Sequence, residues 1–138
     1  MAVGDVEFMH EVYEEWGRGD YSRPFFDEDI ISEAHGLVDM DSGQRGREQV
    51  LEAQRRWLQQ WERPFAVDAE EVIDAGDRVV VLIRWRGRGK GSGAEVEAEG
   101  AHVWELRDRK AVRWDVYRDR DEALAAAGLS GDDAGGRG

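Results

Sequence analysis

Polar and apolar residues alternate most strictly over residues 93–106, in the last third of the chain. Every second side chain from Val96 to Leu106 is apolar or small except His102, and the opposite face carries four glutamates, which are Glu95, Glu97, Glu99 and Glu105. A period of two over this length predicts a long β-strand with one face towards solvent and one towards the interior. His102 is the one ionisable side chain on the predicted interior face, so it is the first candidate for a functional site.

The other segments have helical or strand periodicities of their own. Apolar residues at helical spacing predict a first helix, with Asp5 as its N-cap, and a second that Pro64 stops. A short helical turn is predicted at residues 21–26, and loops at residues 36–46 and 87–93. The predicted helices cover residues 6–16, 47–62 and 121–127, and the other predicted strands cover residues 30–35, 65–74, 79–85 and 111–118.

Helices followed by a meander of long strands predict an α+β domain. We expect a cone-shaped, curved antiparallel sheet packed on the N-terminal helices and enclosing an apolar pocket. The single domain is predicted to span residues 1–129. Residues 130–138 are rich in Gly and Asp, and we expect this tail to be disordered.

Composition excludes several classes of partner. The net charge of −12 argues against binding to nucleic acid or to an anionic membrane surface. The absence of cysteine excludes disulfides and thiolate metal sites, and the three histidines lack the spacing of metal ligands. No secretory signal and no apolar run of membrane-spanning length is visible. We therefore predict a cytoplasmic protein with no metal and no cofactor.

Four segments of the chain resemble the SnoaL-like branch of the nuclear-transport-factor-2-like superfamily. They are Gly46-Arg47-Glu48 and residues 73–82, 102–108 and 117–124. The superfamily includes ketosteroid isomerase, polyketide cyclases, limonene epoxide hydrolase and scytalone dehydratase. The resemblance implies a cone-shaped α+β barrel with an apolar cavity, often in a homodimer formed through the sheet. It implies no single activity, because this fold hosts unrelated chemistries.

The functional groups of ketosteroid isomerase do not carry over to this sequence. The resemblance places the isomerase's carboxylic acid at His102 and its general base at Ala34. It places the isomerase's tyrosine at Val12, one residue from Tyr13. Steroid isomerisation by that mechanism is therefore not expected.

Two further titratable residues are candidate catalytic groups. Glu33 and His35 lie on one face of a predicted strand, with Ala34 on the other. If their face points into the cavity, a carboxylate beside His102 would form an acid/base pair. The alternative is that both side chains lie at a solvated strand end.

The aromatic residues are the candidate ligand-binding groups, because together they could line a cavity for a flat apolar molecule. Core packing is the alternative for several of them. Arg118 could place a cation at the cavity mouth, or it could be a surface residue at the end of a strand. The predicted ligand-binding residues are Tyr13, Trp57, Trp61, Trp85, Trp104, Trp114 and Arg118.

The functional prediction is that this protein binds a small apolar molecule. It could be a cofactor-independent isomerase, cyclase, lyase or hydrolase that uses His102 as an acid or base. The alternative is a non-catalytic ligand-binding or dimerisation module. A homodimer is also predicted, because apolar groups on the outer sheet face need cover. These groups are Val80, Leu82, Val103 and Tyr117.

Overall fold

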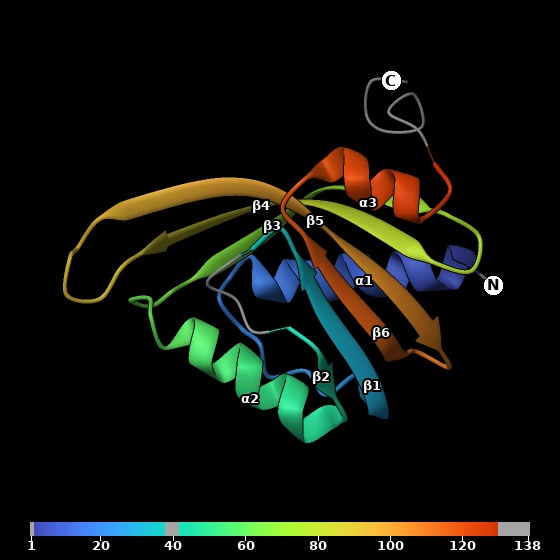
Figure 1. Cartoon of the computed structure of the whole chain (residues 1–138), viewed down its shortest axis with the longest axis horizontal. Coiled ribbons are helices and arrows are strands. Elements are labelled where there is room, and N and C mark those ends of the chain that lie inside the picture. The colour runs from blue at the N-terminus through green and yellow to red at the C-terminus, as the bar shows by residue number, and fades with distance from the viewer. Residues whose placement is uncertain (1, 38–41, 130–138) are drawn as a thin grey trace.

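The computed structural model of the 138-residue chain describes residues 2–37 and 42–129, with side chains from residue 4 onwards. The predicted tail at residues 130–138 lies outside the described residues. The elements follow in the order α1 (Ala2–Trp16), β1 (Phe26–His35), β2 (Gln44–Arg45), α2 (Arg47–Leu58), β3 (Ala66–Asp74), β4 (Val79–Arg88), β5 (Glu95–Arg107), β6 (Lys110–Tyr117) and α3 (Arg120–Ala126) (Figure 1).

The described strands form one curved sheet in the order β2-β1-β6-β5-β4-β3 (Figure 1). The predicted α+β class is confirmed, but the prediction of an antiparallel sheet was incomplete, because β1 runs parallel to β6. The two strands lie far apart in the sequence and no hairpin joins them. Periodicity within each strand therefore carried no information about their relative direction.

The helices cover both faces of the sheet. A large core cluster on one face joins side chains of α1, such as Met9 and Val12, and Val50 of α2 to the sheet. A smaller cluster on the other face contains Ala123 and Leu124 of α3. None of the described helices combines the length and the apolar composition that crossing a membrane requires.

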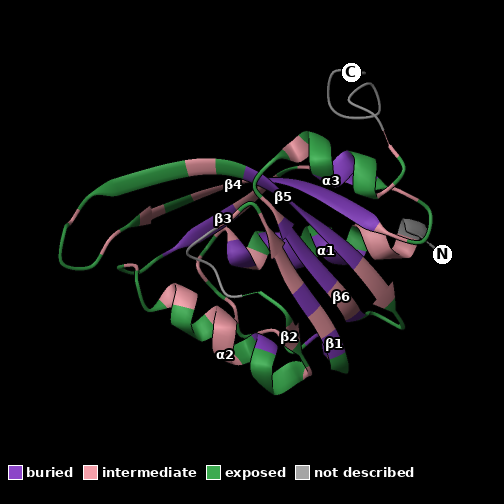
Figure 2. Ribbon diagram, in the orientation of Figure 1, coloured by how far each residue is buried: buried purple, intermediate pink, exposed green. Residues whose placement is uncertain are grey.

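Strand β5 departs from the predicted arrangement of one wet and one dry face. Its first residues belong to a hairpin that extends beyond the body of the molecule, so that even Val96 of the apolar face is 38% exposed (Figure 2). From Gly100 to Trp104 every residue is buried, because Ala101 and Val103 on the outer face lie under α3. Alternation within the strand could not show that a distant helix covers Ala101 and Val103 on the outer face.

The packing of α3 also bears on the predicted homodimer. Val80, Leu82 and Val103 of the outer face belong to the cluster that contains Leu124 of α3. The cover that a second subunit was expected to provide is therefore supplied within the chain. The homodimer stays a prediction, without this argument for it.

Two predictions near the N-terminus were wrong. Helix α1 begins at Ala2, so Asp5 lies inside the helix and does not cap it. The segment predicted as a helical turn has no regular structure up to residue 25, and β1 begins at Phe26. The backbone N–H of Ala111 in β6 donates to the carbonyl oxygen of Phe25 at 2.7 Å, so pairing with the sheet overrides the local preference of this segment.

The end of the second helix was also predicted wrongly. Helix α2 ends at Leu58, four residues early, and the chain then turns towards the β4–β5 hairpin. Trp61 forms a β-bridge with Gly89, and the N–H of Glu62 donates to the carbonyl oxygen of Arg88 at 2.7 Å. Strand β4 correspondingly extends into the predicted loop. Hydrogen bonds between distant segments thus decide both boundaries.

Candidate functional site

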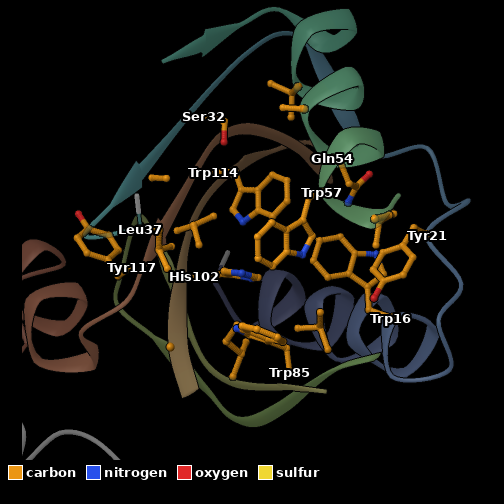
Figure 3. A pocket seen from close by; sticks show the side chains of 18 of the residues that line it. Trp16, Tyr21, Ser32, Leu37, Gln54, Trp57, Trp85, His102, Trp114 and Tyr117 are labelled. Atoms are coloured by element: carbon orange, nitrogen blue, oxygen red, sulfur yellow. The ribbon is translucent and has the colours of Figure 1, made fainter. Parts of the chain in front are cut away.

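An internal pocket with a volume of about 100 Å³ lies between α2 and the inner face of the sheet (Figure 3). Its wall is mostly aromatic and aliphatic, and a few polar side chains such as Ser32 and Gln54 interrupt it. For comparison, an apolar cavity of roughly 150 Å³ holds a benzene molecule. The pocket has about two thirds of that volume and is therefore of the size that suits a small molecule.

His102 lies on the pocket wall with only 4% of its surface exposed. Strand β5 presents it on the same face as Trp104, as the alternating sequence predicted. Burial lowers the pKa of His102 from 6.5 to about 3, because the imidazolium form would lose its hydration. The imidazole is therefore neutral at physiological pH.

Three buried side chains form a hydrogen-bonded chain behind the pocket wall. The indole N–H of Trp104 donates to the hydroxyl oxygen of Tyr13 at 2.9 Å. The Tyr13 hydroxyl lies 2.5 Å from Nδ1 of His102. Burial raises the pKa of Tyr13 well above its usual value, so the hydroxyl keeps its proton. Among the described residues, Nδ1 of His102 is the acceptor within reach of this O–H, and we assign the direction of the hydrogen bond on this ground. With Nδ1 as acceptor, the proton of the neutral imidazole resides on Nε2.

The predicted ligand-binding residues divide into two groups. Trp57, Trp85, Trp114 and Arg118 line the pocket. Tyr13, Trp61 and Trp104 do not line it. Tyr13 and Trp104 support His102 from behind, and Trp61 packs on Trp57, Phe65 and Trp85 beside a separate surface groove.

Sequence reasoning missed several lining residues. Trp16 is the last residue of α1, a helix predicted from its apolar spacing, and Tyr21 belongs to the segment predicted as a helical turn. Both reach the pocket. The polar residue Gln54 shares the predicted apolar face of α2 with Val50 and Trp57, a position that could have marked it as a lining residue.

The expected acid/base pair of His102 with Glu33 or His35 is not formed. Ala34 faces the pocket, and its two neighbours lie on the opposite face of β1. There Nε2 of His35 lies 2.9 Å from a carboxylate oxygen of Asp115. Ala34 has the same strand parity as the fully buried Ile30, whereas Glu33 and His35 share the parity of Ile31, so the sequence alone did not show which face of β1 is the inner one.

The outer cluster around His35 has the shape of a metal site but is already occupied by a cation. Ligand atoms of Glu33, His35 and Asp115 lie within 4.8 Å of one another. Arg113 donates to Glu33 at 2.9 Å and to Asp115 at 2.7 Å, so its single positive charge is shared between the two carboxylates. The ring of Tyr117 stacks on His35 with centroids 4.3 Å apart. These contacts give the cluster a structural role.

Solved structures confirm the architecture. A candidate SnoaL-like polyketide cyclase from Jannaschia sp. CCS1 is 21% identical, with 91% of each chain covered and a TM-score of 0.71. A protein with a ketosteroid isomerase-like fold from Catenulispora acidiphila, solved with trimethylamine, is 21% identical over 91% of this chain and 95% of that chain, with a TM-score of 0.68. TerC co-crystallised with polyporic acid is 20% identical over 91% of this chain and 96% of that chain, with a TM-score of 0.67.

Sequence comparison with families agrees with the structures. No curated protein matches the chain. The SnoaL-like domain family matches residues 9–114, which include the second half of α1, strands β1 to β5, the first part of β6, and His102. At about 20% identity the solved structures show a shared fold and leave the ligand to be argued from this site. The chain belongs to the SnoaL-like domain family and has the nuclear-transport-factor-2-like fold.

Proposed function

We propose that this protein binds a small, largely apolar ring compound in the pocket beside His102. The observation that carries the proposal is a pocket whose wall is mostly aromatic and aliphatic and which also exposes one neutral, buried imidazole. Apolar walls provide the free energy of binding, and a few polar groups orient the ligand. The bound trimethylamine and polyporic acid of two structural relatives are in keeping with this use of the fold.

The proposal is tested by filling the pocket. Ala34 lines it from β1, so Ala34→Leu would place extra methyl groups in the cavity. We expect binding of toluene or cyclohexanone, followed by calorimetry, to weaken at least tenfold in this variant. Ala125→Leu is the matched control, because Ala125 is an exposed residue of α3 on the far side of the sheet. Equal affinities in the wild type and Ala34→Leu would contradict the proposal, as would the absence of any binding to the wild type.

An enzyme is the second candidate, as an isomerase, cyclase, lyase or hydrolase that needs no cofactor. A buried titratable side chain in a pocket supports it. The low pKa of His102 argues against a role as general acid, because the imidazole is not protonated at neutral pH. It also cannot accept a proton from a ligand through Nε2, because this nitrogen already carries one. A catalytic role would therefore fall to a neutral hydrogen-bond donor. The non-catalytic binding module needs no such step and is the reading that the geometry supports best.

A further inference from the structure

Two N–H groups of the pocket wall make no hydrogen bond with the described residues. The indole Nε1 of Trp114 is buried and unpaired, and the side chain is only 9% exposed. The second group is Nε2 of His102, for which no partner is found in the described part of the chain. Trp104, which stacks on Trp114 at 4.9 Å, differs in that its N–H is paired with Tyr13.

An unpaired buried donor lowers stability, so its retention needs a reason. Figure 3 shows the indole nitrogen of Trp114 on the side of the ring that faces His102 and the pocket interior. The two ring centroids lie 5.4 Å apart. The two rings are therefore neighbours on the pocket wall, and each has an N–H group for which the described residues offer no partner.

We propose that the ligand is a ring-sized molecule with a carbonyl oxygen, which accepts hydrogen bonds from Nε2–H of His102 and Nε1–H of Trp114. This inference rests on the proposed function and names the chemical class that the pocket selects. The rest of the ring would contact the aromatic walls formed by Trp57 and Trp85.

The charges around the pocket disfavour the opposite choice, a cationic ligand held by the aromatic rings. A cation would meet two N–H groups with their positive ends towards it. The one carboxylate among the described lining residues, Glu99, is bound by Arg84 at 2.6 Å and lies 3.9 Å from Arg120. Arg118 adds a positive charge among the lining residues. An oxygen acceptor fits this distribution of charge.

A matched pair of compounds tests the inference. Cyclohexanone and methylenecyclohexane have the same shape, but only the ketone has an acceptor oxygen. We expect the wild-type protein to bind the ketone about tenfold more tightly in calorimetric titrations, and to bind tetramethylammonium more weakly than either. Trp114→Phe should remove most of the preference for the ketone. Trp85→Phe is a control on the same wall. It should weaken the binding of both compounds alike and keep the preference for the ketone.

A second readout needs no variant. Adding cyclohexanone should shift the indole N–H resonance of Trp114 in nuclear magnetic resonance spectra, whereas methylenecyclohexane should shift it much less. Equal affinity for the two ring compounds would overturn the inference and leave the proposed function standing. Tightest binding of tetramethylammonium would overturn it in favour of a cation cage. Failure of every compound to bind the wild type would overturn both proposals.

Discussion

Lowering the pH from 7 to 4 is expected to remove on the order of 3 kcal/mol of unfolding free energy through His102 alone. The pKa of this side chain is about 3 in the folded protein and 6.5 as a free group. Between these values the unfolded chain binds a proton that the folded protein excludes. The contribution of His102 is therefore complete above pH 6.5 and is lost as the pH falls towards 3.

The measurement is urea unfolding at pH 7, 5 and 4 for the wild type and His102→Phe. Other groups titrate in both proteins, so the informative quantity is the difference between their unfolding free energies. That difference should move in favour of the variant by about 3 kcal/mol as the pH falls. The control is His10→Gln, which replaces an exposed histidine. The difference in unfolding free energy between this variant and the wild type should change little with pH. A difference between the wild type and His102→Phe that stays constant with pH would show that His102 is accessible to protons in the folded state.

Replacing Tyr13 by phenylalanine is expected to cost about 2–6 kcal/mol of unfolding free energy at neutral pH. The hydroxyl accepts from Trp104 and donates to His102, and both partners are buried. Removing one oxygen atom therefore leaves two buried polar groups unpaired, at about 1–3 kcal/mol each. Chemical denaturation at neutral pH measures the loss.

Tyr117→Phe is the matched control for this substitution. Tyr117 is half-buried and packs its ring on His35, and its hydroxyl forms no hydrogen bond with the described residues. Its loss should change stability by less than about 1 kcal/mol. Equal effects of the two substitutions would contradict the buried chain from Trp104 through Tyr13 to His102.

Much of the inner face could be predicted from the sequence, because it depends on local periodicity. The pattern of β5 placed His102 correctly towards the interior, and the apolar face of α2 supplied Trp57. Both assignments need only the direction of alternating side chains within one element. Alternation within one element does not predict burial where a different helix or strand packs over the side chain.

The errors share this origin. Glu33 and His35 were correctly placed together on one face of β1, but the short polar strand did not show which face meets the pocket. Val103 was correctly placed on the outer face, but the sequence did not show that α3 folds back over it. Tyr13 was predicted to bind the ligand but lies behind the pocket wall, and its role depends on a hydrogen bond to a residue 89 positions away.

The central claim is that His102 is a neutral imidazole, protonated on Nε2, in the wall of a ligand-binding pocket. Nitrogen-15 spectra of histidine-labelled protein test it directly, because the chain has only three histidines. We expect one histidine to stay neutral from pH 7 to pH 4 and to carry its proton on Nε2. Its nitrogen resonances should shift when cyclohexanone is added. Titration of all three histidines near pH 6.5, with no response to the ketone, would contradict it.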